Sequence, residues 1–465
     1  MYPINLNIKT PWVDGQTKSF TEDSTTPPVP VGTAPKSGFS ASPLTGTAPL
    51  IVKFTNGSTG TAPLTYKWDF SDGITNSGNA EQNPTRTFPT AKSYTITLIV
   101  TNAYGTDTAT KVSYITATSP PTPTGMGCPT TVNGYAIGGG AGYPAYTSGV
   151  PGGSYNGATV LTRVQFLAAI AGAAAPAVIY IDPSADIDFT DERLVIPAGV
   201  IIASNRGVSG SLGGRLRTQK PGSNWGVPLF ITGGAGVRFT GVRVQGECYA
   251  ENYSDNESSF RVGLWLQHNG CVVDNCDFKG FGYANIMCWQ VSQSGRPWIH
   301  HNYIHHSHNA HEGYGVNVEG GDALVEGNIF EHNRHHISAG GKAGEYYTFR
   351  YNKITDDTMS TVGRQAIDVH ERETNPNVSG ERYDIYNNTI VSGTACAVHV
   401  TSQPVGAGHY IYNNIFNCNP GGVGYVAAIA YTYNSGQPHG KMYATNNMWN
   451  GVLYPTNTTI VQYQG

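Results

Sequence analysis

The sequence predicts an all-β protein in which a β-sandwich precedes a right-handed parallel β-helix with an N-terminal capping helix. The first observation is a phrase that recurs between residues 273 and 449: an Asn, one variable residue, then an apolar residue. Successive copies lie between 24 (352 − 328) and 36 (388 − 352) residues apart, a period typical of stacked solenoid units. The copies are Asn302, Asn328, Asn352, Asn388, Asn414 and Asn447, with Cys276 in the same place of an earlier, degenerate copy.

Short alternating runs between these copies are the second observation. Runs such as 315–319, 366–370 and 397–401 have a period of two and are rich in β-branched residues, which predicts strands. Two or three short strands per coil indicate a parallel β-helix, because the Leu framework of a leucine-rich horseshoe is absent. We expect each Asn to occupy a tight turn with left-handed backbone and to join its neighbours in an amide ladder.

Four segments follow one another along the chain. Residues 1–36 are polar and Pro-rich and predict an arm or linker, residues 37–118 a β-sandwich, residues 119–157 a Pro/Gly-rich linker, and residues 158–465 the β-helix. At the start of the last segment, Thr162 is the predicted N-cap of a short helix, whose apolar face is predicted to hold Val164, Leu167 and Ile170. Such a helix covers the open end of a solenoid.

Two phrases in the sandwich carry a family resemblance. Trp68-Asp69-Phe70-Ser71-Asp72-Gly73 and the strand 94–102 closely resemble a PKD domain, the immunoglobulin-like module of surface proteins. The resemblance covers the whole of segment 37–118 and implies a spacer or adhesion module without catalysis. We expect Trp68 to fill the core and Asp69 and Asp72 to serve the turn, with a Ca²⁺ site at these aspartates as the alternative; no other cofactor is expected.

The opening of the second domain, a helix followed by strands, resembles the pectate-lyase-like superfamily of β-helix proteins over about residues 158–455. That resemblance implies the scaffold. Trp298-Ile299-His300-His301 is similar to a Trp-Ile-Asp-His phrase of pectate lyases, but His300 stands in the place of the Asp. The paired acids that would hold calcium in that family are not recognisable either, so the reaction is not implied.

Composition restricts the function classes. Only 12% of the 465 residues are charged and the net charge is −4, which suits an extracellular, cell-surface or virion protein and gives a nucleic-acid partner no electrostatic support. No apolar run is long enough to span a bilayer, and no signal peptide is visible. There are seven Cys residues, and Cys396 and Cys418 are predicted to form either a disulfide or two buried free thiols.

Aligning the alternating runs by their apolar residues predicts which side chains leave the solenoid. Residues between inward ones must point outward, because successive side chains of a strand alternate between its faces. One predicted outward column is Asn317, Ser338, Asp368, His399 and Ala430. The next is Glu319, Gly340, His370 and Thr401, and the one before is Gly315, His336, Ala366 and Ala397.

A carboxylate next to imidazoles suits acid/base chemistry, and a nearby guanidinium can stabilise an oxyanion. The candidate catalytic residues are therefore Asp368, His370, His399 and Arg334. The candidate substrate-binding residues are Asn317, Glu319, His336, Arg364, Glu371 and Arg372. The alternative is a solvated β face without function. A second group, the histidines at 300, 301, 305, 306, 308 and 311, suggests metal binding or, alternatively, structural histidines in turns and stacks.

Two function hypotheses follow. One is a structural and glycan-binding protein, such as an adhesin or a spike, fibre or sheath subunit, that binds cell-surface polysaccharide or its own copies. The other is a polysaccharide lyase or glycoside hydrolase acting on an acidic polymer. A lyase would use His or Arg to remove a proton beside a uronate carboxylate, whereas a hydrolase needs two acids, for which Asp368, Glu319 and Glu371 are the candidates.

Overall fold

The chain separates into two compact units, residues 1–122 and 123–465, and each is described by itself. The computed structural model describes residues 32–47, 50–71, 82–88, 92–118, 126–143, 159–190, 192–219, 227–248, 260–289, 291, 295–309, 312–355, 365–370, 378–392, 396–406, 408–418, 427–432, 441–454 and 461–464. Within these residues, no helical stretch has the length and apolar character needed to cross a bilayer.

The first unit is a β-sandwich. One sheet has the order β1-β3-β5 and the other β2-β7-β6-β4, with all pairings antiparallel except β2 with β7. The strands are β1 (Phe39–Ser42), β2 (Thr45–Thr47), β3 (Leu50–Asn56), β4 (Thr65–Asp69), β5 (Thr85–Phe88), β6 (Lys92–Asn102) and β7 (Gly105–Thr118). The alternating burial along β6 is what a half-buried strand with one face on a core requires.

Aromatic rings fill the core of this sandwich, and Trp68 lies among them, as the sequence predicts. Trp68 is buried and stacks on Phe70, with ring centroids 5.9 Å apart, and Phe39 and Phe54 pack around it. Asp69 serves the turn, because its Oδ1 accepts a 2.8 Å hydrogen bond from the backbone N–H of Ser71. The other aspartate of the expected calcium site, Asp72, lies outside the described residues.

The second unit is a parallel β-helix whose coils contribute strands to three sheets. The first sheet contains β10 (Ala177–Tyr180), β13 (Val200–Ala203), β16 (Arg238–Thr240), β19 (Val272–Asp274), β22 (Trp298–His300), β25 (Asp322–Glu326), β28 (Tyr346–Arg350), β31 (Arg382–Tyr386), β34 (His409–Tyr412) and β37 (Met442–Thr445). The second sheet contains β11 (Asp186–Asp188), β14 (Arg215–Arg217), β17 (Arg243–Gln245), β20 (Asp277–Lys279), β23 (Tyr303–His305), β26 (Ile329–Glu331), β29 (Lys353–Ile354), β32 (Thr389–Ser392), β35 (Ile415–Cys418), β38 (Asn447–Trp449) and β39 (Val452–Tyr454). The third sheet contains β12 (Leu194–Ile196), β15 (Val227–Thr232), β18 (Arg261–Leu266), β21 (Ala284–Trp289), β24 (Tyr314–Glu319), β27 (His335–Ala339), β30 (Gln365–Val369), β33 (Cys396–Thr401), β36 (Ile429–Thr432) and β40 (Val461–Gln464).

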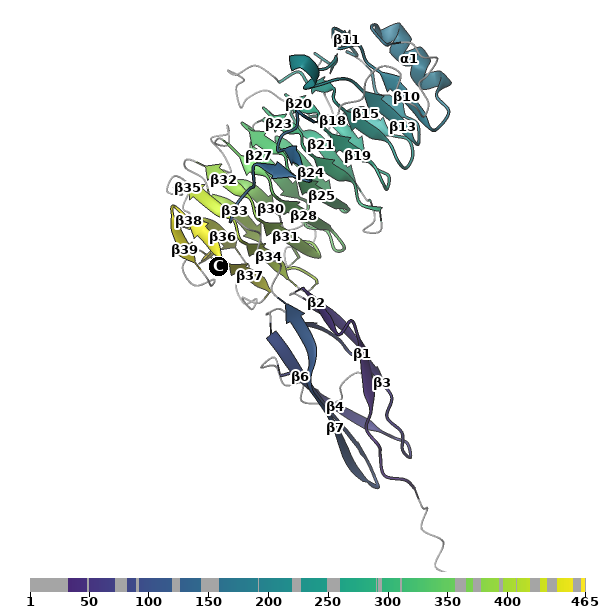
Figure 1. Cartoon of the computed structure of the whole chain (residues 1–465), viewed down its shortest axis with the longest axis vertical. Coiled ribbons are helices and arrows are strands. Elements are labelled where there is room, and N and C mark those ends of the chain that lie inside the picture. Colours follow the sequence, from purple (N-terminus) through teal and green to yellow (C-terminus); the bar gives the residue numbers. More distant parts are fainter. Residues whose placement is uncertain are drawn as a thin grey trace, which may run out of the picture. The chain divides into compact units, whose positions relative to one another are not determined.

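Each sheet lays its strands in chain order, coil upon coil, from β10 at one end towards β37 and β38 at the other (Figure 1). Apolar side chains at matching positions stack inside the solenoid: Val325, Phe349 and Ile385 are register partners on successive coils, and all are buried in one continuous core. Each coil thus buries its apolar side only against its neighbours, which is why the pattern repeats through the sequence.

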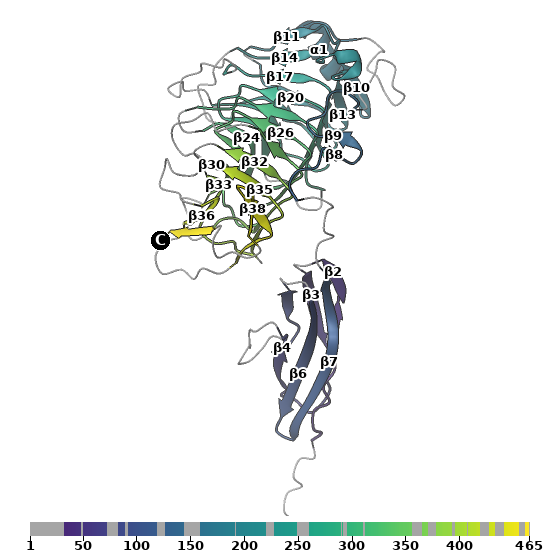
Figure 2. The same cartoon turned by 60° about the vertical axis from the view of Figure 1, so that its left-hand side comes forward.

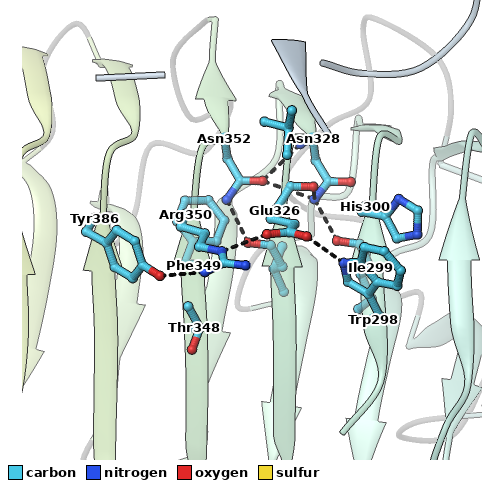
Figure 3. Close-up of polar contacts among 12 residues, drawn as sticks. Trp298, Ile299, His300, Glu326, Asn328, Thr348, Phe349, Arg350, Asn352 and Tyr386 are labelled. Carbon is cyan, nitrogen blue, oxygen red and sulfur yellow. Dashed lines mark hydrogen bonds and ion pairs between the residues drawn. The ribbon is translucent and has the colours of Figure 1, made fainter. Parts of the chain in front are cut away.

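The repeated Asn forms a buried amide ladder along this core. The side-chain N–H of Asn328 donates to Oδ1 of Asn352 at 3.0 Å, and the backbone N–H of Asn328 donates to the same oxygen, also at 3.0 Å (Figure 3). The pattern runs unbroken from Asn302 to Asn447, and the backbone N–H of Cys276 donates to Asn302. The ladder is confirmed.

The left-handed backbone lies one residue before the position expected. His301 (φ 54°) and Tyr351 (φ 55°) adopt it, and the ladder residue follows each of them. The ladder Asn therefore keeps its amide pointing inward, and the preceding residue makes the turn.

The outer face of the first sheet carries its own polar network beside the ladder. Glu326 is only 2% exposed, and its two carboxylate oxygens accept from Nε1 of Trp298 (2.8 Å) and from Nε of Arg350 (2.6 Å) (Figure 3). Arg350 also donates to the hydroxyl of Tyr386 at 2.8 Å. These contacts join four successive coils from the outside.

The helix α1 (Arg163–Gly172) lies against β10 at the first coil, as expected (Figure 1). Thr162 is its N-cap and forms a capping box with Gln165. The predicted buried face is partly wrong, since Val164 is 77% exposed and the fully buried residue is Phe166, which packs on Phe189 at 4.9 Å. The core in the first coil is aromatic, so the helix turns its largest ring towards it.

Residues 126–143, which fall within the expected linker, pack along the β-helix. They contain the hairpin of β8 (Thr131–Val132) and β9 (Tyr135–Ala136), whose position beside the sheets is visible in Figure 2. The carbonyl of Val132 contacts Nε2 of His301 at 2.9 Å, and Gly138 N–H donates to the carbonyl of Gly327. A short 3₁₀ turn, Val208–Gly210, lies between β13 and β14.

Candidate functional site

The candidate site lies on the outer face of the third sheet. The register pairs Asn317 with Ser338, Ser338 with Asp368, and Asp368 with His399, which is the column that the alternation predicts. Ile367 and Val369 belong to the interior core, so Asp368 between them points outward.

Asp368 is the centre of an imidazole cluster, defined here as Asp368, His335, His370 and His399. Its Oδ2 lies 2.5 Å from Nε2 of His370 and 3.8 Å from Nε2 of His335, and its Oδ1 lies 3.5 Å from Nδ1 of His399. Gln365 donates to Oδ1 at 2.8 Å. The carboxylate is thus surrounded by nitrogens from three neighbouring strands.

Charge in the cluster is concentrated on one ion pair. The carboxylate of Asp368 raises the pKa of His370 to about 9, against the opposing effect of burial. Burial alone would raise the pKa of Asp368, but the surrounding imidazoles, His370 first among them, together outweigh it and hold that pKa well below the ordinary value. Burial lowers the pKa of His335 to about 3. At neutral pH, His370 is an imidazolium, Asp368 a carboxylate and His335 a neutral imidazole.

Accessibility divides the roles within the cluster. The side chain of His370 is 49% exposed, whereas that of His399 is 10% exposed and that of Asp368 is fully buried. Asp368 was expected on an open face, and this expectation needs correction, because the surrounding imidazoles and Gln365 cover it. Asp368 can orient and charge His370, but it cannot itself touch a polymer.

His336 is placed wrongly by the sequence. Its side chain is buried and packs against the interior ring of Phe330, with centroids 6.0 Å apart, and its Nδ1 lies 3.1 Å from Nδ2 of Asn333. His336 and Ile337 are consecutive residues that both face inward, and so are Ala366 and Ile367 on the next coil. The alternation of inward and outward side chains therefore begins only after the corner at the start of each strand. His335, one residue earlier, takes the outward place.

Two residues of the site, His335 and Glu312, were not singled out from the sequence. His335 stacks on Tyr314 with a 17° interplanar angle, and the charge of Glu312 favours the proton on His370. Arg334, a predicted catalytic candidate, opposes that proton through its charge. The adjacent His-His pair was a usable signal, but it did not show which of the two faces outward. Arg364, Glu371 and Arg372 lie outside the described residues.

An aromatic strip continues the same outer face towards the N-terminal coils. We define it as Trp265, Trp289, Tyr283 and Tyr314. Trp265 and Trp289 meet edge to face at 5.6 Å, and Tyr283 and Tyr314 do so at 5.6 Å. These rings pack on a small outer cluster of Val262, Ala284 and Met287, separate from the interior core.

Glu319 and Lys342 connect the strip to the imidazole cluster. Glu319 pairs in register with Trp289 and forms an ion pair with Lys342, whose Nζ also lies 4.2 Å over the ring of Trp289. The Glu319 carboxylate lies over Gly340, where any Cβ would meet it. Asn317 completes this region with a long contact of 3.5 Å to the hydroxyl of Tyr283.

The second histidine group forms stacks and polar pairs. His300 stacks on Trp298 at 3.8 Å, and His305 stacks on Tyr303 at 3.9 Å and contacts Asp277 at 2.9 Å. In the described part of the chain, no group of three or more His, Cys, Asp or Glu is arranged to hold a metal ion. His311 of this group lies outside that part.

Comparison with known proteins identifies the first unit. Residues 35–117 match the family model of the PKD domain. The PKD domain is typical of extracellular proteins and often mediates interactions. No curated protein matches the chain. A PKD domain joined to a parallel β-helix indicates an extracellular structural or binding protein.

Proposed function

We propose that this chain is a surface protein whose β-helix binds an acidic polysaccharide along the outer face of the third sheet. The observation that carries the proposal is one outward column in which Trp289, Glu319, Gly340 and His370 follow each other on successive coils. A flat, partly exposed ring and an exposed imidazolium are thereby aligned along the axis of the solenoid.

The chemistry of this column suits a chain of sugars that carry carboxylates. An aromatic ring offers an apolar surface to the C–H face of a pyranose, while His370 supplies positive charge for a uronate. The ion pair with Lys342 offsets the negative charge of Glu319 in the same column. The spacing of parallel strands, about 4.8 Å, is close to the length of a sugar residue, so neighbouring coils can contact successive residues. Burial of Asp368 further favours binding, since its negative charge is screened from the polymer by His370.

Affinity measurements with paired polymers test the proposal. We expect the full chain to bind oligogalacturonate in isothermal titration calorimetry at least tenfold more tightly than a neutral oligosaccharide of the same length. Trp289→Ala should reduce this affinity by about tenfold, the usual scale for a buried aromatic anchor. The matched control is Tyr104→Ala, which removes a 41% exposed ring from the PKD domain. Equal affinities for both polymers, or equal effects of both substitutions, would refute the proposal.

A second candidate function, cleavage of the bound polymer, is favoured by the Asp368–His370 pair. An imidazolium oriented by a buried carboxylate is a competent general acid, and Arg334 beside it can stabilise an oxyanion. A lyase would release unsaturated uronates that absorb in the ultraviolet, whereas a hydrolase would release only reducing ends. Cleavage that is lost in both Asp368→Asn and His370→Gln would establish this function, and absence of both products from the wild-type chain would exclude it.

We extend the proposal to assembly: the chain acts as a subunit of a spike, fibre or sheath. The support is the combination of a PKD domain with a solenoid, both of which are building modules. Light scattering at increasing protein concentration tests this point. A mass that stays at 49.6 kDa throughout would contradict it.

A further inference from the structure

A polar cavity of about 190 Å³ opens on the second sheet, away from the strands that carry the imidazole cluster. Its walls come from β14, β17 and β20, which are successive strands of that sheet (Figure 2). The charged or amide-bearing residues that line it are Arg215, Arg243, Gln245, Asp277 and Lys279.

Two of these residues present hydrogen-bond donors that the protein leaves unused. Arg243 donates from Nε to the carbonyl of Gly213 at 2.8 Å, and its two terminal nitrogens make no hydrogen bond within the described residues. Gln245 accepts from Arg215 through Oε1 at 3.4 Å, and its amide N–H₂ is likewise unbonded within the same residues. In the part of the chain that the structure describes, the N–H groups of Arg243 and Gln245 therefore line the cavity without a protein acceptor.

Two arginines also lie side by side on adjacent strands, an arrangement that is unfavourable unless an anion or a carboxylate offsets the charge. Arg215 and Arg243 are register partners on adjacent coils, and like charges directly opposite each other destabilise a sheet. Burial and, after it, the charge of Arg215 lower the pKa of Arg243 from its ordinary value, in keeping with this proximity. Both side chains stay protonated, because the ordinary pKa of arginine is far above neutral.

Carboxylates near the cavity are already bonded to other groups. Asp186 accepts from Nε of Arg215 (2.9 Å) and from Nε of Arg217 (2.8 Å), and Asp188 accepts from Arg217 at 2.8 Å. Asp277 is engaged by His305 and lies in the field of the buried Arg206. Among the described residues, the positive charge in the cavity that no carboxylate bonds is therefore that of Arg243.

From this arrangement, we propose that the cavity between β14, β17 and β20 binds an oxyanion, with the terminal nitrogens of Arg243 and the amide of Gln245 as donors. The shared ligand chemistry is that of a sulfate, phosphate or carboxylate group. Its source is either a free inorganic ion or an anionic substituent of a glycan, and the volume leaves space for part of a sugar beside the charged group. The inference does not depend on the polymer site of the third sheet.

Titration calorimetry at pH 7 and constant ionic strength tests the inference in the full chain. The probes are sodium phosphate, sodium sulfate, a sulfated disaccharide and a uronate disaccharide. We expect saturable one-to-one binding that is about tenfold or more weaker in Arg243→Gln, the scale of a lost charge-assisted hydrogen bond. Arg243→Lys, which keeps the charge but loses the planar fork, should lie between the two. Arg193→Gln, which removes an exposed arginine elsewhere on the β-helix, is the matched control.

The outcomes separate the possible sources and the two proposals. Tighter binding of a disaccharide than of the inorganic ions assigns the site to a glycan substituent, and the reverse order assigns it to a free ion. Trp289→Ala and His370→Gln should leave binding of phosphate unchanged. No saturable binding by the wild-type chain, or equal loss in Arg243→Gln and Arg193→Gln, would overturn the inference. Should Arg243→Gln fail to fold, anomalous diffraction from wild-type crystals soaked in selenate decides: a peak inside the cavity supports the site and its absence overturns it.

Discussion

Asp368 and His370, two residues apart on the outer face of one strand, form an ion pair 2.5 Å long in which the carboxylate is fully buried and the imidazole is half exposed. The pair presents a positive charge to solvent while hiding its negative partner. This separation favours the proposed binding of an acidic polymer over its hydrolysis, which needs two accessible carboxylates.

The ion pair makes a prediction for Asp368→Asn. The pKa of His370, about 9 in the native protein, should fall towards its ordinary value of 6.5 once the carboxylate charge is removed. Proton NMR of the imidazole Cε1–H measures this titration directly. Asp107→Asn, a substitution in the PKD domain, should leave it unchanged, and an unaltered His370 titration in Asp368→Asn would show that the pair does not set the charge.

The same pair should affect stability over a defined pH window. The folded pKa of His370 is raised, so its contribution is complete below about pH 6.5 and is lost as the pH rises through about 9. The folded pKa of Asp368 is lowered, so its contribution is present above about pH 3.8 and is lost on further acidification. Urea unfolding of the wild-type chain and of His370→Gln should therefore differ most between pH 4 and 6.5, and a difference that grows above pH 9 would contradict this.

Buried neutral histidines predict acid sensitivity of the β-helix. Burial lowers the pKa of His409 to about 3, and its ring is held by Ser379 (2.9 Å) and stacked on Tyr383. On acidification, the histidine is protonated in the unfolded chain near pH 6.5 but in the folded chain only near pH 3. The free energy of unfolding should therefore fall below pH 6.5 by about 1.4 kcal/mol per pH unit for each such histidine. His409→Gln should reduce the slope between pH 4 and 6 by about that amount. An unchanged slope would show that His409 is protonated in the folded protein.

Removal of one ladder amide should be costly. Asn352→Ala deletes the acceptor of two N–H groups of Asn328 and the donor to the carbonyl of Val325, all of which are buried. Each buried polar group that is left without a hydrogen-bond partner costs about 1–3 kcal/mol, so we expect a loss of roughly 3 kcal/mol or more in the free energy of unfolding. Asn417→Ala, at an exposed position of β35, should change it by less than about 0.5 kcal/mol. Comparable effects in urea unfolding would mean that the ladder contributes little.

The seven cysteines are free, and Cys396 and Cys418 are buried thiols rather than a disulfide. Burial raises the pKa of Cys128 to about 12 and also raises that of Cys396, which disfavours the reactive thiolate. A thiol reagent should therefore react slowly with the native chain and should count seven thiols after denaturation without reductant. A count of five would indicate one disulfide.

Much of the scaffold is predictable from local patterns, because every coil must bury its apolar side against its neighbours and does so with the same residue pattern. The Asn phrase identifies the ladder, the alternation identifies the column through Asp368 and His399, and the Trp68 phrase identifies the core of the sandwich. The ladder and the column are predictable because the same residue type has the same role in every coil, and the sandwich core is predictable because its phrase is characteristic of one domain family.

Features that depend on corners and on packing between distant segments were not predictable. The inward turn of His336 arises where two successive residues of a coil face the core, and no sequence period marks that corner. Asp368 is covered by His335 and His399, which lie on the neighbouring coils and approach it only in the folded chain. The face of α1 was misjudged because the aromatic end of the core attracts Phe166.

The most direct test of the account is the pH dependence of oligogalacturonate affinity in the wild-type chain and in His370→Gln, with Lys353→Gln as a control that removes an exposed charge from the second sheet. If the charge of His370 holds the polymer, wild-type affinity falls as the pH rises through about 9, His370→Gln binds about tenfold more weakly at pH 7, and the fall through pH 9 is reduced in this variant. Identical affinities and identical pH profiles in the wild type and His370→Gln would contradict it.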